Sequence, residues 1–328
     1  MGVREEIMSR AADNVGHMLR RRVAETPNKL AFMYPDGAAE GPNTWTKLTW
    51  TESSDIIDKL AAGLLARGLK YEDRVAICSS TRLEWLFLDL AIAVAAGATT
   101  TVYPNTASPD VHYIVGDSGS KVFVAENAEQ VAKVTDDSEF DDQLHTIVVI
   151  DGTGVTFDDR IISYEKLQEL GEAHLKDNPK ALEESIASTN HDTLSTLIYT
   201  SGTTGRPKGA VHVHAGFPIK AAHDLAACFD LQADDTIFWL TDLGWMMGPW
   251  LIYGALINGA TICLYDGAPD HPTTDRMWEF CAKHKVEVLG ISPTLVRSLA
   301  ADRTADTSVR PTGTHLDGGT GDADKSVR

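Results

Sequence analysis

The chain has 328 residues, of which 43% are hydrophobic and 23% are charged, a composition ordinary for a globular protein with a sizeable core. Its formal net charge of −18 repels phosphate backbones and anionic lipid surfaces, so we expect no nucleic-acid partner. The 4 cysteines lie far apart and lack the spacing of a zinc site or a disulfide framework.

No segment has the pattern of a secretory signal or a membrane span. The N-terminal residues mix both charges and contain no apolar centre. The most apolar run, WLFLDLAIAVAA, is too short to cross a bilayer and carries Asp89. We therefore expect a cytoplasmic protein without an integral membrane segment. The sequence gives no indication of an oligomeric state.

Short β-rich runs alternate with amphipathic helical stretches along most of the chain. The first run, KLTW, ends at Trp50. We expect Thr51 to cap the following helix and Gly68 to end it, with an apolar face formed by Ile56, Ile57, Leu60, Leu64 and Leu65. Further strands are predicted at RVAICS, TTTVYP, KVFVAE, TIVVID, TLIYTS, TIFWLT, ATICLYD and VEVLGIS. This order predicts an α/β fold with parallel pairing and right-handed crossovers.

The alternation stops at about Arg303. Residues 302–328 contain only Val309, Leu316 and Val327 as large aliphatic side chains, too few to offset the entropy of ordering this segment. We expect a polar, disordered tail, with the composition that a frameshift or a foreign ending would produce.

A glycine-rich turn follows the predicted strand TLIYT, within LIYTSGTTGRPKG at residues 197–209. Its glycines let several backbone N–H groups converge on an anion, and Lys208 adds a point charge. We expect it to bind a polyphosphate through Thr200, Ser201, Gly202, Thr203, Thr204, Gly205, Lys208 and Gly209. The spacing differs from that of a Walker loop. The alternative is an exposed Gly/Ser/Thr hairpin without a ligand.

The segment YTSGTTGRPKG resembles the signature phosphate loop of the AMP-forming adenylating enzymes, which include acyl-CoA synthetases, luciferases and peptide-synthetase adenylation domains. The similarity to acyl-CoA synthetases extends over nearly all of residues 15–299. Segments before the loop, such as TTTVYPNTA, are similar to long-chain fatty-acyl-CoA ligases, and segments after it, such as FWLTDLGWMMGPW, to acetyl-CoA-synthetase-like enzymes. The resemblance implies the large N-terminal domain of these enzymes, with alternating β-α units in two packed subdomains.

The resemblance also implies a reaction. A small carboxylic acid and ATP, with Mg²⁺, give an acyl-adenylate and pyrophosphate, and coenzyme A then receives the acyl group as a thioester. A carboxylate is already a nucleophile at neutral pH, so the first step needs charge neutralisation more than proton transfer. We assign that catalytic role to Lys208 and Thr204. The alternatives are a non-catalytic nucleotide-binding remnant and a kinase or ATPase.

The segment TDLGWMMGPW, residues 241–250, is similar to the family's turn along the acyl and pantetheine channel. The similarity implies Trp245 and Gly248 as pocket residues, although the apolar start of a core helix explains the same sequence. His212 and His214 alternate on a predicted strand without a third ligand nearby, so we expect structural histidines and no metal site.

Members of the resembled family continue beyond the position of Leu299 with segments that contact adenine, Mg²⁺ and ribose, and with a C-terminal domain that supplies a catalytic lysine. None of these is recognisable in this sequence. We therefore expect residues 1–301 to form an incomplete AMP-binding domain, residues 302–328 to form the tail, and the C-terminal domain to be absent. Complete turnover by this chain alone is expected to be weak or nil.

Overall fold

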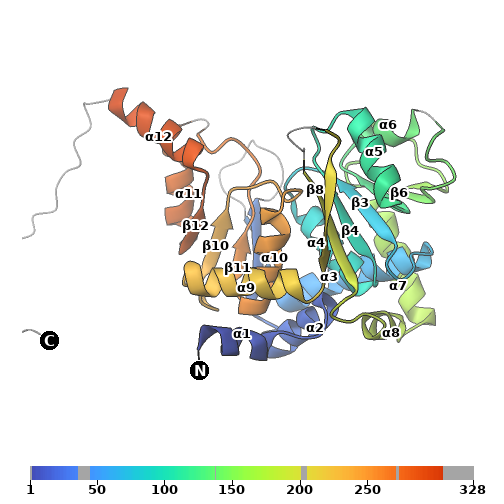
Figure 1. The fold of residues 1–328 in the computed structure, drawn as a ribbon, viewed down its shortest axis with the longest axis horizontal. Helices are drawn as coiled ribbons and strands as arrows, with labels where there is room; N and C mark the ends of the chain where they lie inside the picture. Colours follow the sequence, from blue (N-terminus) through green and yellow to red (C-terminus); the bar gives the residue numbers. More distant parts are fainter. Residues whose placement is uncertain (1, 36–44, 137, 201–204, 271–272, 306–328) are drawn as a thin grey trace, which may run out of the picture.

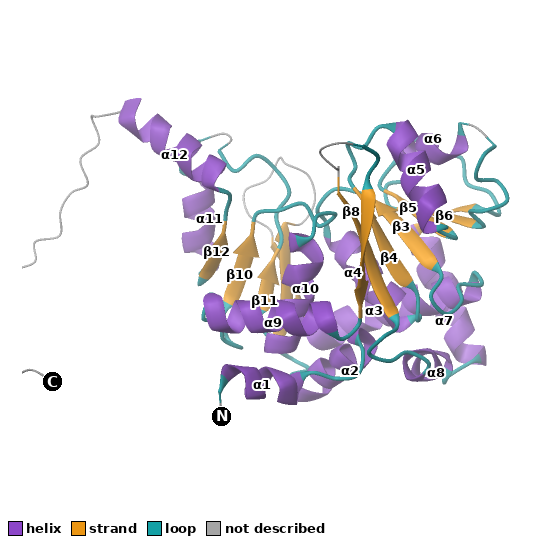
Figure 2. Ribbon diagram, in the orientation of Figure 1, coloured by secondary structure: helices purple, strands orange, loops and turns teal. Residues whose placement is uncertain are grey.

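The computed structural model describes residues 2–35, 45–136, 138–200, 205–270 and 273–305, which form two β-sheets and the helices around them (Figures 1 and 2). Sheet A contains, in spatial order, β12 (Val288–Gly290), β10 (Thr236–Trp239), β11 (Thr261–Cys263), β1 (Leu30–Pro35) and β2 (Trp45–Thr49). Sheet B contains β7 (Ile161–Ser163), β6 (Thr146–Val149), β5 (Val122–Ala125), β3 (Arg74–Cys78), β4 (Ala98–Val102), β8 (Leu194–Thr200) and β9 (Lys208–Val213).

Most neighbouring strands are parallel, which confirms the predicted α/β fold. Two pairs are antiparallel and were not predicted: β2 pairs with β1 at one edge of sheet A, and β9 pairs with β8 at one edge of sheet B. The prediction also lacked β1 and the three-residue strand β7. Antiparallel neighbours can be joined by a short turn, so β9 follows β8 as a hairpin without a crossover helix.

The helices accompany the strands as the alternation predicts. In chain order they are α1 (Val3–Arg10), α2 (Val15–Glu25), α3 (Trp50–Ala66), α4 (Leu83–Val94), α5 (Ser108–Ser118), α6 (Ala128–Thr135), α7 (Tyr164–Asp177), α8 (Ala181–Ala187), α9 (Gly216–Cys228), α10 (Met247–Asn258), α11 (Arg276–His284) and α12 (Pro293–Ala305). The last helix continues past the predicted domain boundary at residue 301, and residues 306–328 of the expected tail lie outside the described residues.

Successive side chains of the central strands face different layers of the protein. Val75 and Ile77 of β3 belong to the largest buried cluster, which also includes residues of α3, α4, α10 and sheet A. Ala76 and Cys78 instead pack with residues of α5 and α6. A third cluster joins the opposite face of sheet A to α11 and to Leu299 of α12. The two sheets therefore share one buried helical layer and have separate outer layers.

Helix α4 forms part of this shared layer, which explains why its sequence is apolar on all sides. Every residue of the helix except Glu84 is buried. Its length and composition fit a core helix, and among the described residues no helix is both long and apolar enough to cross a bilayer.

The start of α3 differs from the prediction. The helix begins at Trp50, and Thr49 is its cap: the Thr49 hydroxyl accepts a hydrogen bond from the backbone N–H of Glu52, whose carboxylate accepts one from the N–H of Thr49. This reciprocal box requires a glutamate three residues after the cap, which Thr49 has and Thr51 lacks. The predicted end is confirmed, because Gly68 follows the helix with a φ of 88°.

Asp89 is a carboxyl group inside the shared layer. It is fully buried, and its Oδ1 accepts a hydrogen bond of 2.7 Å from the hydroxyl of Thr99 in β4. Burial raises the pKa of Asp89 from 3.8 to about 6, while the hydrogen bond from Thr99 and the neighbouring hydroxyl of Tyr253 favour the ionised form to a smaller extent. Between these two pKa values the folded state binds more protons than the unfolded state, so stability falls as the pH rises through this window.

We predict that Asp89→Asn removes this part of the pH dependence, because an amide keeps the acceptor for Thr99 and carries no charge. Between pH 4 and pH 7 the unaltered chain should lose about 2–3 kcal/mol of stability that the variant retains. Urea denaturation at several pH values measures the difference. Identical pH slopes for both chains would contradict the assignment to Asp89.

Candidate functional site

The predicted phosphate loop connects the two strands of the β8–β9 hairpin. Thr200 is the last residue of β8 and Lys208 the first of β9, and the two are paired across the antiparallel ladder. Both side chains are exposed. Four predicted members of the loop lie outside the described residues: Ser201, Gly202, Thr203 and Thr204. The described ends therefore form a hairpin, a geometry that suits both the phosphate loop and the alternative of an exposed turn.

Two glycines of the loop have different surroundings. Gly205 is exposed, and a side chain there would meet no atom within 4 Å. Gly209 lies opposite Tyr199 in the ladder, and a Cβ atom on it would lie 2.8 Å from Cζ of that tyrosine. The tyrosine ring thus covers the backbone of Gly209, and only glycine leaves room for it.

The topology places the loop at the edge of the sheet where open α/β proteins bind ligands. Strand β8 runs parallel to β4, and β4 runs parallel to β3. The segments that follow these three strands therefore leave sheet B at the same carboxyl edge. Figure 2 shows this edge beside the carboxyl ends of β10 and β11 of sheet A.

A cleft of about 310 Å³ lies between the two carboxyl edges. Its walls come from the segments that follow four parallel strands: Thr81 after β3, Tyr103 after β4, Leu240, Thr241 and Asp242 after β10, and Tyr265, Asp266, Gly267 and Pro269 after β11. Thr81 joins the two sheets, because its hydroxyl donates to the carbonyl of Thr241 at 3.1 Å and accepts from the N–H of Leu243 at 3.2 Å. Each sheet therefore contributes one side of the cleft.

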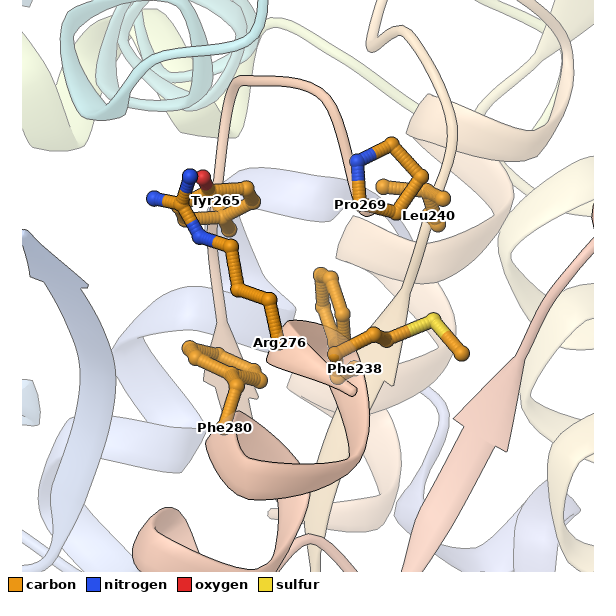
Figure 3. Close-up of a pocket in the computed structure, with 7 residues that line it drawn as sticks. Phe238, Leu240, Tyr265, Pro269, Arg276 and Phe280 are labelled. Carbon is orange, nitrogen blue, oxygen red and sulfur yellow. The ribbon is translucent and has the colours of Figure 1, made fainter. Parts of the chain in front are cut away.

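A smaller apolar pocket adjoins this cleft and shares Leu240, Tyr265 and Pro269 with it. Figure 3 shows Phe238 and Phe280 at its base, and the side chain of Arg276 extending toward Tyr265. The guanidinium carbon of Arg276 lies 5.0 Å from the centroid of the Tyr265 ring. The pocket's volume of about 20 Å³ is enough for about one water molecule, so we assign these aromatic side chains to packing beneath the cleft.

Among the residues that the structure describes, two carboxyl groups line the cleft. Burial raises the pKa of Asp242 to about 6, with smaller contributions from the negative charges of Asp266 and Glu126. The backbone N–H of Gly244 donates to Asp242 at 2.7 Å and favours the ionised form. Burial also raises the pKa of Asp266. The carboxylate oxygens of Asp242 and Asp266 can accept hydrogen bonds from hydroxyl or amine groups of a ligand, and their negative charge repels phosphate. The positive charge of Lys208 would instead attract phosphate.

The structure separates the two predicted pocket residues. Trp245 is 44% exposed, and its ring centroid lies 5.8 Å from that of Tyr103, a residue of the cleft wall. Gly248 is buried in α10, where a Cβ atom would lie 2.2 Å from the carbonyl oxygen of Leu243. Trp250, also buried, belongs to the shared core. Trp245 thus lies at the rim of the cleft, whereas Gly248 and Trp250 form the packed start of a core helix.

His214 has the surroundings of a structural histidine. It is fully buried, and its Nδ1 accepts a hydrogen bond of 3.2 Å from the backbone N–H of Val15. Burial lowers its pKa to about 4, which keeps the ring neutral at pH 7. His212 is partly buried, and its ring centroid lies 4.5 Å from that of Phe217. In the described ranges, no group of three or more His, Cys, Asp or Glu side chains is arranged to hold a metal ion.

Several residues of the cleft were missed by the reasoning from sequence, namely Thr81, Tyr103, Asp242 and Asp266. Each lies within three residues after the end of a strand, and parallel strands end at a common edge. The same rule that located the glycine-rich loop would have identified these positions as candidates.

We predict that Gly248→Ala destabilises the chain by about 1–3 kcal/mol, because the added methyl group would overlap the carbonyl of Leu243. Gly116→Ala is a matched control, since its Cβ would meet no atom within 4 Å and the position is exposed in α5. Urea denaturation of both variants measures the difference. Equal stability of the two would overturn the packing role of Gly248.

Comparison with known proteins identifies the group to which the chain belongs. The profile of the family described as "AMP-binding enzyme" matches residues 19–320. An acetyl-coenzyme A synthetase from Saccharophagus degradans is 32% identical over 289 residues, which are 85% of this chain and 43% of that protein. One from Chlorobaculum tepidum is 28% identical over 260 residues, which are 76% of this chain and 38% of that protein.

A solved structure has the same fold. The acetoacetyl-CoA synthetase from Streptomyces lividans matches with a TM-score of 0.73 and 25% identity over 89% of this chain and 45% of its own. The chain thus spans less than half the length of each of these three proteins. The match over residues 19–320 nevertheless covers most of the chain, which therefore belongs to the AMP-binding enzyme family.

Proposed function

We propose that this chain carries the carboxylate-activating part of an AMP-forming acyl-CoA ligase. The observation that supports it best is a hairpin with the family's loop sequence, ending in Lys208, at the same sheet edge as a cleft lined by both sheets. The family assignment does not favour a kinase or an ATPase. Relatives whose names specify acetyl-coenzyme A synthesis suggest a short carboxylic acid as the substrate.

In this proposal, the hairpin binds the phosphates of ATP. Lys208 and Thr204 are the catalytic residues, since a positive charge and a hydroxyl donor stabilise the negative charge that develops on departing pyrophosphate. The other predicted loop residues supply backbone and hydroxyl donors around the phosphates. The carboxylate of the substrate then bonds to the α-phosphorus as the bond to pyrophosphate breaks, and the products are an acyl-adenylate and pyrophosphate.

The cleft between the sheets would hold the acid and part of the nucleotide. Its volume of about 310 Å³ lies at the lower end of the range for small-molecule sites. Trp245, paired with Tyr103 at the rim, would limit the length of the acyl group. Asp242 and Asp266 would accept hydrogen bonds from ligand hydroxyl groups. Coenzyme A would receive the acyl group in the second step.

Mg²⁺ normally accompanies ATP in the family that the sequence resembles. The described residues offer no cluster of three donors for the ion, and we derive no step through it.

We predict that Lys208→Ala lowers acid-dependent exchange of labelled pyrophosphate into ATP by about 10²–10³-fold, as expected when one preorganised donor to a developing charge is removed. Lys176→Ala, an exposed lysine of α7, serves as the control and should leave the exchange unchanged.

Each outcome of this experiment separates the hypotheses. Exchange that survives Lys208→Ala would remove Lys208 from the catalytic role. ATP binding without exchange in the unaltered chain would favour the non-catalytic remnant. Formation of ADP would favour a kinase or an ATPase.

A further inference from the structure

Helix α5 contacts the β8–β9 hairpin on both sides of its loop. The hydroxyl of Tyr199, which precedes the loop, donates a hydrogen bond of 2.7 Å to Oδ2 of Asp117. The guanidinium carbon of Arg206, at the β9 end of the loop, lies 5.2 Å from the centroid of the Tyr113 ring. Tyr113 and Asp117 are four residues apart in the helix and therefore project from the same face. One helix face thus contacts both ends of the loop.

The contact with Tyr199 is the stronger of the two. The tyrosine is only 9% exposed, and its acceptor is a carboxylate, which makes the hydrogen bond charge-assisted. Burial, followed by the hydrogen bond and the negative charge of Asp117, raises the pKa of Tyr199, so the phenol keeps its proton and donates it. Because the ring also lies over Gly209, this single side chain contacts both strands of the hairpin and α5.

Helix α5 is itself fixed to the body of sheet B. Nε of Arg74, in β3, donates to the carbonyl of Ser118 at 2.6 Å, at the C-terminal end of the helix. The side-chain amide of Gln143 donates to the carbonyl of Val115 at 2.8 Å. Val111 and Val115 on the inner side of α5 pack in the same cluster as the strand residues. The helix is therefore a rigid support for the hairpin rather than a peripheral segment.

We propose that Tyr113 and Asp117 are positioning residues that hold Lys208 in place for the nucleotide phosphates. Lys208 lies between Arg206, which contacts Tyr113 of α5, and Gly209, which packs against the Tyr199 ring that Asp117 holds. A donor held in position before the ligand arrives loses less conformational entropy on binding, and therefore binds more tightly. This inference rests on the proposed role of Lys208 in phosphate binding and assigns α5 a part in it.

The first test measures the affinity of the chain for ATP. Tyr199→Phe, Asp117→Ala and Tyr113→Leu should each weaken binding by about fivefold to tenfold, the usual effect of losing one such contact. Asp117→Asn keeps a hydrogen-bond acceptor and should restore most of the affinity. Asp110→Asn, at the opposite end of α5, is the control and should bind ATP as the unaltered chain does. Unchanged affinity in Asp117→Ala would overturn the proposal.

A double-mutant cycle with Lys208→Ala distinguishes positioning from a general structural role. If α5 acts through Lys208, Asp117→Ala should cause little further loss of ATP affinity once the lysine is absent. A loss of the same size in both backgrounds would show that Asp117 does not act through Lys208 and would overturn the proposal.

A second measurement needs no nucleotide. Amide hydrogen exchange of residues 208–211 reports local opening of the hairpin. Exchange there should become several-fold faster in Asp117→Ala and return toward the original rate in Asp117→Asn, while the amides of α4 remain unchanged. Equal rates in all three chains would contradict the support by α5. If the unaltered chain binds no ATP, the proposed function fails, and hydrogen exchange alone then decides whether α5 holds the hairpin.

Discussion

Burial of one helical layer between two sheets is the constraint on which the rest of the structure depends. Helix α4 is apolar almost throughout and packs with residues of both sheets. Each sheet must therefore present an apolar face to the same layer, which alternation along the strands provides. Because the strands of both sheets then end beside one another, Tyr103 from one sheet and Asp242 from the other reach a common cleft. The candidate site is thus a consequence of how the core is packed.

The local pattern of apolar and polar residues was sufficient to predict most of the strands and the fold class. Each predicted strand exists, because a short apolar run bounded by polar or glycine residues carries its own signal. Strand β1 was not predicted, although its run LAFMYP is also short and apolar; its pairing with β2 and with the distant β11 is seen only in the structure. The cap of α3 was placed two residues too late, at Thr51. Thr49 is the better cap because Glu52 stands three residues after it and completes the capping box.

Part of the candidate site was likewise predictable from the sequence, and part was not. The glycine-rich loop and Lys208 were recognisable from composition and spacing alone. The support from α5 could not be predicted from the sequence. A tyrosine and an aspartate four residues apart are common on helices, and their role depends on the residues that they contact. Asp117 and Tyr199 are 82 residues apart in the chain, so only the folded structure brings them together. The close approach of Gly248 to the carbonyl of Leu243 was likewise not visible in the sequence, and its role as a pocket residue stays a prediction.

The ring of Tyr199 also determines how the two strands of the hairpin can slide past each other. If β9 were displaced by one residue, Lys208 or Ala210 would take the position opposite the ring, and either would bring a Cβ atom into space that Gly209 leaves empty. The observed register, with Gly209 opposite Tyr199, is therefore favoured because Gly209 has no Cβ atom. The absence of a side chain at Gly209 therefore sets the register of β9, and with it the position of the Lys208 ammonium group relative to β8.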